Sequence, residues 1–252
     1  MCFEVLKSKA EIESARRELR RRALSFASPW WEHLAFRLGI SKRIEVGDKL
    51  KSWDVLKTVD FIERNVSTTA RILDIGAFAS ELPCILHNLD YSKLVGIDLN
   101  PDIKKMPYAD AVRYEVSNFT HTSFASESFQ VITAISVIEH GFNSRLLLTE
   151  ISRLLGPQGY FIASIDYWPD KIETNGVRFF GMDWKIFSAE EINAFLDEAM
   201  EFNLFPYGEM NLTGRDKAIQ CENKNYTFGW LVLQKRPPAM DAKIDLRRRE
   251  SL

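Results

Sequence analysis

Residues 71–83 read RILDIGAFASELP, an apolar run that leads through Gly76 into a stretch suited to a helix. About twenty residues further on, residues 94–98 read LVGID, a second apolar run that ends in an acid. In an open α/β sheet such strand ends line the ligand crevice, and an acid after the second strand can hold both ribose hydroxyls. The two runs predict an adenosine-type ligand. The alternatives are a plain turn glycine at Gly76 and a cap at Asp98 before Asn100 and Pro101.

The residues after Gly76 narrow the choice of ligand. Dinucleotide sites use G-x-G-x-x-G so that bare backbone can approach the pyrophosphate, whereas Phe78 stands at the second glycine position here. No Gly-Lys-Ser/Thr follows that would form a triphosphate loop. This argues against NAD, FAD and ATP, and leaves S-adenosylmethionine, which carries adenosine without a phosphate.

The chain beyond residue 65 alternates short apolar runs with helical stretches, as repeated βαβ units around a parallel sheet do. Seven strands are predicted, at Arg71–Ile75, Lys93–Asp98, Val112–Val116, Phe129–Ile135, Gly159–Ile165, Leu204–Leu212 and Tyr226–Gln234. Helices are predicted at Glu4–Ala27, Ser28–Leu38, from Ser52, and at Ser80–Leu89, Arg145–Leu155 and Ala189–Phe202. We expect an α/β fold with a doubly wound, seven-stranded, mostly parallel sheet, an antiparallel last strand and an N-terminal helical cap.

Five motifs between Lys51 and Gln234 resemble, in order, those of the class I, seven-strand S-adenosylmethionine-dependent methyltransferases. They are DIG at 74–76, GID at 96–98, SNF at 117–119, AISVIEH at 134–140 and LLGPQGYFI at 154–162. The sequence departs from the family pattern at the second and third motif glycines, at an adenine-binding aspartate and at the start of the fourth strand, where it has Phe78, Ser80, Asn118 and Gln130. An asparagine oxygen can still accept a hydrogen bond from adenine. Because Ser80 can cap a helix from Glu81, with Pro83 in its first turn, we interpret the glycine loop as a functional variant.

The resemblance implies S-adenosyl-L-methionine as methyl donor and S-adenosyl-L-homocysteine as product. It assigns Asp74 and Gly76 to the methionine part, Asp98 to the ribose, and Leu99 to one face of the adenine. The other donor-binding positions it implies are Ala77, Phe78, Asn118, Phe119 and Ser136, with Asn118 and Phe119 at the adenine and Ser136 near the sulfonium.

Two residues are candidates for acid–base chemistry. Methyl transfer is an in-line displacement on an activated sulfonium, so the protein supplies alignment and, for a hydroxyl acceptor, a base. His140 follows the fourth predicted strand and Asp166 the fifth, at the edge where the transferred methyl group should lie. The alternatives are a structural histidine that caps a loop and an aspartate that starts the turn before Trp168 and Pro169.

Acceptor choice is expected to lie in the N-terminal helices and in residues 166–187. This second stretch concentrates aromatic and charged residues, among them Tyr167, Trp168, Phe179, Phe180, Trp184 and Phe187. Such a lining suits a sugar or a planar ring. The alternative is that these aromatic side chains pack the stretch onto the sheet.

Composition excludes several partners. The 252 residues are 46% hydrophobic and 27% charged, with 33 Lys+Arg against 35 Asp+Glu, so no overall positive field attracts nucleic acid or anionic lipid. The arginine run at 16–22 is interspersed with glutamates and is interpreted as a solvated helix face. No apolar run reaches the roughly 18 residues of a membrane span, and no signal peptide is recognised.

No metal or disulfide is predicted. Cys2, Cys84 and Cys221 are far apart and fit a reducing cytoplasm. The histidines other than His140, which are His33, His87 and His121, are interpreted as structural or surface residues. Magnesium, which needs only a few acids, stays open.

The sequence therefore predicts an S-adenosylmethionine-dependent methyltransferase that acts on a small molecule or glycan, at oxygen, as a monomer or homodimer in the cytoplasm. Residues 1–50 are expected to form a helical extension and 51–236 the donor-binding domain, with an acceptor-side insertion at 166–187 and a flexible tail at 237–252. The alternative is a catalytically silent binding or regulatory protein of the same fold.

Overall fold

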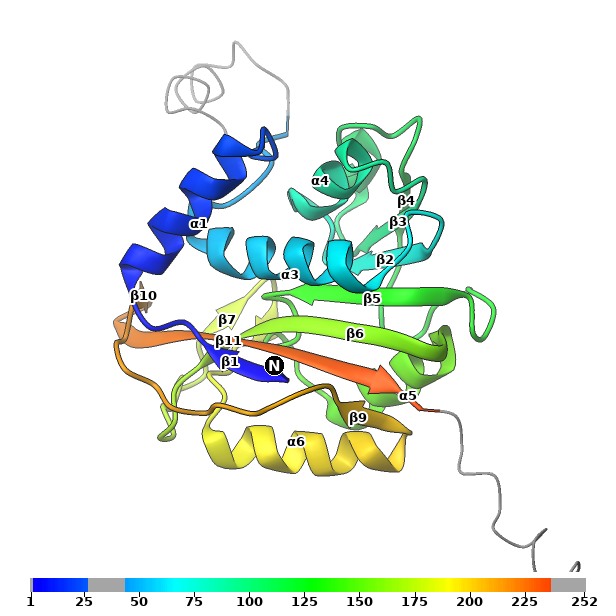
Figure 1. The fold of residues 1–252 in the computed structure, drawn as a ribbon. Coiled ribbons are helices and arrows are strands. Elements are labelled where there is room, and N and C mark those ends of the chain that lie inside the picture. The colour runs from blue at the N-terminus through cyan, green and yellow to red at the C-terminus, as the bar shows by residue number, and fades with distance from the viewer. Residues whose placement is uncertain (1, 27–43, 237–252) are drawn as a thin grey trace, which may run out of the picture.

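The computed structural model describes residues 2–26 and 44–236 (Figure 1). Within these residues, one sheet holds the strands β1 (Phe3–Val5), β2 (Arg71–Ile75), β3 (Lys93–Asp98), β4 (Arg113–Val116), β5 (Phe129–Ile135), β6 (Leu155–Tyr167), β9 (Leu204–Pro206), β10 (Ile219–Cys221) and β11 (Lys224–Lys235). The helices are α1 (Lys9–Arg21), α3 (Ser52–Asn65), α4 (Leu82–Asn88), α5 (Ser144–Leu154) and α6 (Ala189–Glu201), with short 3-10 helices η1 (Lys49–Lys51) and η2 (Pro101–Lys105). A separate hairpin joins β7 (Arg178–Phe179) to β8 (Met182–Asp183).

The main path of the sheet has the order β4-β3-β2-β5-β6-β11-β1. β4, β3, β2, β5 and β6 are parallel, and β11 runs antiparallel to β6, β1, β9 and β10. Each of the seven predicted strands overlaps an observed one, and the predicted fold with its antiparallel last strand is confirmed. Beyond Pro206 the predicted strand at 204–212 is wrong, because the chain there bonds to the N-terminus instead, with Asn211 N–H donating to Phe3 O.

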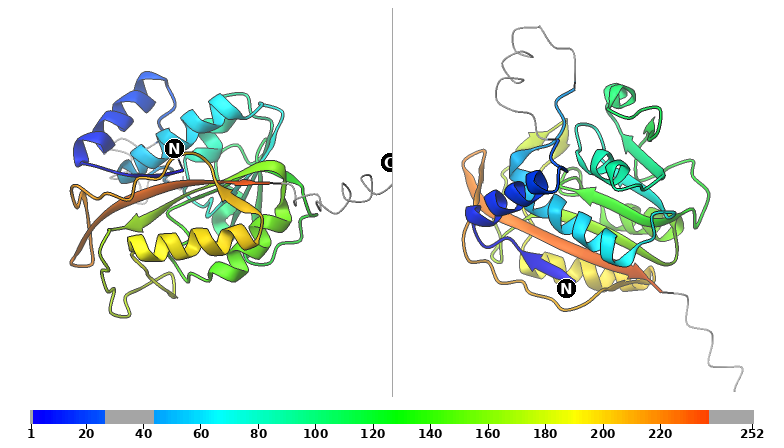
Figure 2. Two further views of the ribbon diagram at one scale, coloured as in Figure 1. Left: turned by 60° about the horizontal axis from the view of Figure 1, so that its bottom comes forward. Right: turned by 45° about the horizontal axis from the view of Figure 1, so that its top comes forward.

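Helices cover both faces of the sheet, with α1, α3 and α4 on one side and α5 and α6 on the other (Figures 1 and 2). In α3 the side chains of Val55, Val59 and Ile62 recur at helical spacing and are buried, which explains why this stretch packs as a helix. α6 begins with a capping box in which Ser188 accepts from the Glu191 N–H. The result is a core on each face, with the carboxyl ends of the parallel strands left for a site.

The N-terminus corrects one prediction. Residues 3–5 form β1 rather than the start of a helix, and β1 pairs antiparallel with β11 in the register Phe3 to Leu231. The helix begins only at Lys9, and Leu6 and Leu19 are completely buried rather than peripheral. The sequence did not reveal β1 because three residues carry too little alternation, and the partner strand lies at the other end of the chain.

The arginine run is also corrected at one position. Arg17 and Arg21 are exposed beside glutamates, as a solvated helix face requires, but Arg16 is 5% exposed and paired with Glu81. The predicted helix at Ser28–Leu38 and the tail at 237–252 lie outside the described residues.

Candidate functional site

A cavity of about 760 Å³ opens at the carboxyl ends of the parallel strands. Its walls come from the turns that follow β2, β3, β4 and β5, from residues 47–51 before α3, and from the β7–β8 hairpin. This is the position at which open α/β sheets bind ligands. The prediction that the strand ends meet at one site agrees with this geometry.

The turn after β2 depends on Gly76. Its φ is +73°, and a Cβ there would stand 2.3 Å from Cγ2 of Val137 on the turn after β5. Glycine is therefore required both by the left-handed backbone and by the close approach. Ala79 also adopts a left-handed conformation, with φ of +62°. Ser80 Oγ accepts from the Leu82 N–H at 3.3 Å, so it supports the start of α4, which begins one residue later than predicted.

The end of β3 places Asp98 and Leu99 in the cavity wall. The Asp98 carboxylate accepts from the Asn100 N–H at 2.8 Å and from the Phe78 N–H at 3.2 Å. It therefore links the turns after β2 and β3. Leu99 is 53% exposed, and Phe119 lines the same cavity from the turn after β4.

Three predicted donor-binding residues do not line the cavity. Asp74 is buried and does not line the cavity. Its carboxylate accepts from Thr133 Oγ1 at 2.6 Å, and burial raises its pKa to about 7. Ala77 is fully buried. Asn118 is exposed, and its oxygen accepts from both the N–H and the Oγ1 of Thr120. These residues shape the turns, whereas Gly76, Phe78, Asp98, Leu99, Phe119 and Ser136 line the cavity itself.

Lys51 is a cavity residue that the sequence did not indicate. Its Nζ donates to Ser136 Oγ and lies 3.8 Å from the centroid of the Phe228 ring. Among the described residues that line the cavity, Lys51 is the sole cation. Ser136, with φ of +51°, is held by its own N–H, which donates to Ser164 Oγ at 3.1 Å. Nothing in the local sequence of Lys51 points to a partner 85 residues away.

His140 lines the same end of the cavity as Lys51 and Ser136. Burial, reinforced by the positive charge of Lys51, lowers the pKa of His140 to about 4, so the imidazole is neutral at pH 7. Within the described part of the chain its Nδ1 is buried and has no hydrogen-bond partner. The rings of Phe179 and Phe180 stand edge-on to it, with centroid distances of 5.7 and 5.8 Å. The predicted base therefore faces the cavity.

Asp166 does not face the cavity. It is 4% exposed and accepts from Trp184 Nε1 at 2.7 Å. Asp54 and Glu139 are buried in the same way, and burial raises the pKa of Asp54 to about 6 and holds those of Glu139 and Asp166 above their usual range. The charge of Lys51 acts in the opposite direction on all three carboxyls. None of these three acids lines the cavity, so Asp166 is not placed to touch an acceptor.

The aromatic stretch at 166–187 divides between the two expected roles. Tyr167, Trp184 and Phe187 are buried against the sheet, as the packing alternative expected. Phe180, at the tip of the β7–β8 hairpin, is 87% exposed and lines the cavity together with Met182. Only the hairpin tip therefore serves as a cavity wall.

No group of three His, Cys, Asp or Glu residues within 2–26 and 44–236 could hold a metal ion. His87 packs against Tyr108, with ring centroids 4.5 Å apart, and His121 is exposed, whereas His33 lies outside the described residues. In the part of the chain that is described, no helix is long and apolar enough to cross a membrane.

Comparison with known proteins identifies the central part of the chain. A family model described as a methyltransferase domain matches residues 73–163, which run from β2 into β6 and carry most of the cavity turns. Residues 73–163 are thus similar to a methyltransferase domain. The predicted enzyme class, an S-adenosylmethionine-dependent methyltransferase, and the predicted donor are thereby confirmed.

Solved structures show that the fold of this methyltransferase is shared at low sequence identity. The [4+2]-cyclase SpnF is 12% identical with a TM-score of 0.58, over 76% of this chain and 85% of that one. Geranyl diphosphate C-methyltransferase from Streptomyces coelicolor A3(2) is 14% identical with a TM-score of 0.54, over 83% and 99%. Phosphoethanolamine N-methyltransferase 2 from Haemonchus contortus is 16% identical with a TM-score of 0.53, over 72% and 52%. No curated protein sequence matches the chain.

Proposed function

We propose that the methyltransferase transfers the methyl group to an oxygen of a small-molecule or glycan acceptor. The observation that carries this proposal is His140, a neutral imidazole that lines the cavity beside Lys51 and Ser136. A base is needed when the acceptor is a hydroxyl, since the proton must leave as the new carbon–oxygen bond forms.

The cavity residues fit the donor. The carboxylate of Asp98 is placed to accept from ribose hydroxyls, and Leu99 and Phe119 offer apolar surface for an adenine ring. The missing side chain at Gly76 leaves room for the methionine part, where a Cβ would be crowded. The donor supplies a methyl group already activated on a sulfonium.

At the transfer end, His140 would accept the hydroxyl proton while the acceptor oxygen forms its bond to the methyl carbon and the sulfur–carbon bond breaks. The ammonium of Lys51 would favour the developing negative charge on that oxygen. Phe180 and Met182 would pack against the acceptor's ring or apolar part. The alignment of these groups, rather than a covalent intermediate, is what the protein contributes.

Other observations support a small acceptor. Two structures that share the fold are named as methyltransferases of geranyl diphosphate and of phosphoethanolamine, which are small molecules. With 33 Lys+Arg against 35 Asp+Glu, the chain lacks the excess of positive charge that favours nucleic acid. We also propose that residues 1–50 form an N-terminal extension and residues 51–236 the donor-binding domain. A cytoplasmic location is proposed because Cys2, Cys84 and Cys221 are free thiols.

The test is a screen for S-adenosylhomocysteine formation with hydroxyl, carboxylate and amine acceptors, followed by His140→Gln. With a hydroxyl acceptor we expect kcat to fall about 100-fold and the affinity for S-adenosylhomocysteine to stay within about twofold. Because burial and Lys51 lower the pKa of His140 to about 4, turnover should hold constant through pH 6.5 and fall only as the pH approaches 4.

His87→Gln is the matched control, since His87 packs on Tyr108 and does not line the cavity. Unchanged turnover in His140→Gln would remove His140 as the base. Donor binding without transfer to any acceptor would favour the alternative of a catalytically silent protein, and the cyclase named above shows that this fold can serve another reaction.

A further inference from the structure

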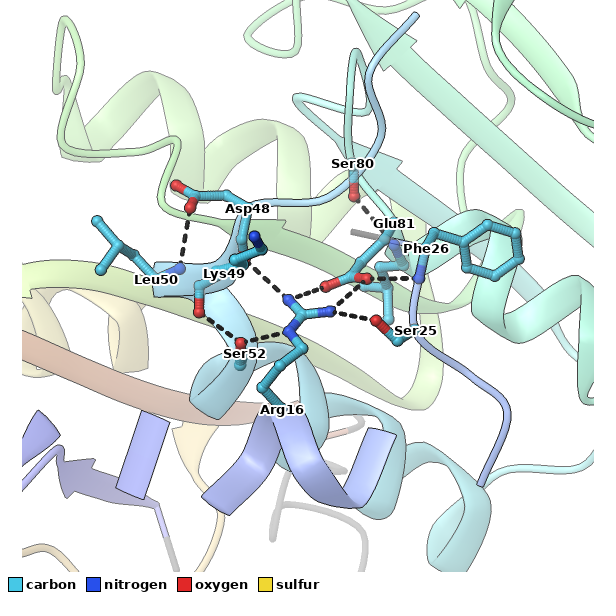
Figure 3. A network of polar contacts seen from close by, with 10 residues as sticks. Arg16, Ser25, Phe26, Asp48, Lys49, Leu50, Ser52, Ser80 and Glu81 are labelled. Atoms are coloured by element: carbon cyan, nitrogen blue, oxygen red, sulfur yellow. Dashed lines mark hydrogen bonds and ion pairs between the residues drawn. The ribbon is translucent and has the colours of Figure 1, made fainter. Parts of the chain in front are cut away.

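Arg16 on α1 is buried and binds Glu81, a residue of the cavity wall (Figure 3). Arg16 and Glu81 are 5% and 2% exposed, and Glu81 lines the cavity. Nη2 of Arg16 lies 2.7 Å from Oε1 of Glu81, and Nη1 lies 3.0 Å from Oε2. The pair is bidentate, a geometry that fixes orientation as well as distance.

The remaining donors of the Arg16 guanidinium reach three further segments. Nε donates to Ser52 Oγ at 2.8 Å, Nη1 to Ser25 Oγ at 3.0 Å, and Nη2 to the Asp48 carbonyl at 2.9 Å. All five N–H groups are thus used. One side chain joins α1, the residues after it, the start of α3 and the turn that follows β2.

These partners belong to two walls of the cavity. Residues 47, 48 and 51 form one wall and residues 78–81 the other. The walls touch where the Gly47 N–H donates to the Ala79 carbonyl at 2.9 Å. Arg16 bonds to Asp48 on one side and to Glu81 on the other, so it sets the distance between the two walls.

We infer that Arg16 is a positioning residue for the methyl donor, which acts through Glu81 and Asp48 without itself lining the cavity. The inference deepens the proposed function and rests on it only for the place where the donor binds. From the sequence, the N-terminal helices are expected to determine acceptor choice. The inference instead gives one of them, α1, a role in donor binding.

The conformation of the turn gives the physical reason. The glycine loop has Phe78 and Ser80 at two positions where the motif has glycine, and Ala79 holds a left-handed φ of +62° that costs energy for a residue with a Cβ. Such a turn persists only when its surroundings hold it in place. The bidentate bond from Arg16 to Glu81 supplies that restraint. If apolar side chains replaced this buried ion pair, the stability of the protein could be preserved, but Glu81 and its turn would lose the bond that fixes their orientation.

The experiment measures the affinity for S-adenosylhomocysteine by calorimetry in Arg16→Lys, Arg16→Met, Glu81→Gln and the double variant Arg16→Met/Glu81→Gln. Each protein is measured well below its own melting temperature. We expect the dissociation constant to rise about tenfold in both Arg16 variants, because neither side chain can hold Glu81 bidentately. The effects in the double variant should not add, since both residues act through the same turn.

Arg153 offers a matched control. It binds Glu150 bidentately, with Nη2 2.7 Å from Oε1 and Nε 2.9 Å from Oε2, and it also donates to the Phe124 carbonyl. Neither Arg153 nor Glu150 lines the cavity. Arg153→Lys should lower the melting temperature while the dissociation constant stays within about twofold.

The inference is overturned if a folded Arg16 variant binds S-adenosylhomocysteine within about twofold of the unchanged protein, or if Arg153→Lys weakens binding equally. Where both Arg16 variants fail to fold, Glu81→Gln decides in the same way, because it keeps the shape of the side chain but replaces one accepting oxygen by an NH2 group that cannot accept from Arg16. A different result is that the protein binds the donor in a way that depends on Arg16 and yet transfers no methyl group to oxygen. That result would support this inference and contradict the proposed function.

Discussion

The two ends of the cavity are built in different ways. The donor end consists of the turns after β2, β3 and β4, so its residues Gly76, Asp98, Leu99 and Phe119 all come from residues 76–119. The transfer end draws Lys51, Ser136, His140 and Phe180 from segments spread over residues 51–180.

The difference concerns how each end is held. At the donor end, the backbone N–H groups of Phe78 and Asn100 bond to the Asp98 carboxylate, and the one distant side chain that we propose to hold the turn, Arg16, does not line the cavity. At the transfer end side chains from distant segments meet, as Lys51 and Ser136 do. We therefore expect substitutions at the donor end to weaken donor binding, and those at the transfer end to change turnover and acceptor preference.

The largest effect is expected at Gly76. Gly76→Ala adds a Cβ 2.3 Å from Val137 at a φ of +73°, so the turn must move, and the dissociation constant of S-adenosylhomocysteine should rise about 100-fold in calorimetry. Gly176→Ala is the control, because Gly176 has the same φ of +73° and no neighbour within 4 Å of an added Cβ. It should lose about 1 kcal/mol of stability and keep its affinity. Equal affinities in the two variants would show that the close approach to Val137 is unimportant.

A smaller loss is expected at Asp98. Asp98→Asn removes one of two carboxylate oxygens that bond to backbone N–H groups and that we propose to bind the ribose, and hydrogen bonds to charged groups are worth about 1.5–3 kcal/mol. The dissociation constant of S-adenosylhomocysteine should rise roughly 30-fold, with kcat unchanged at saturating donor. Asp102→Asn, in the exposed pair with Lys105, should change neither quantity. A larger loss in kcat than in affinity would place Asp98 at the transfer end instead.

The smallest effect is expected at Phe180. Because this side chain is 87% exposed, Phe180→Ala should leave the free energy of unfolding within about 0.5 kcal/mol, while the KM for the acceptor rises about threefold. Leu146→Ala, at a residue 51% exposed on α5, serves as the control for loss of exposed apolar surface. An unchanged acceptor KM in Phe180→Ala would remove the hairpin tip from the acceptor site.

The same difference explains what the sequence could predict. The fold, Gly76 and Asp98 were predictable because each depends on a short local pattern, a strand followed by a tight turn. Lys51, Arg16 and β1 were not, because each acts on a residue that is far away in the sequence, such as Glu81 for Arg16. The hydrophobic periodicity of a short segment predicts its secondary structure, but it does not predict a contact with a residue that is distant in the sequence.

Individual side chains were harder to predict than their positions in the fold. Asp74, Asn118 and Asp166 all stand at strand ends, as predicted, yet one oxygen of each accepts from a protein group, on Thr133, Thr120 and Trp184 respectively. A pattern can place a residue at the edge of a sheet, but the direction of the side chain depends on neighbours from other strands.

The pairing of β1 with β11 has a consequence for how the protein is made. Phe3 pairs with Leu231, which is synthesised long after Phe3 because it lies near the other end of the described chain. β1 therefore stays without its partner strand until β11 has emerged, even though the parallel strands β2 to β6 can already assemble. The pairing of β1 with β11 therefore follows the synthesis of the parallel strands and joins the two ends of the described chain.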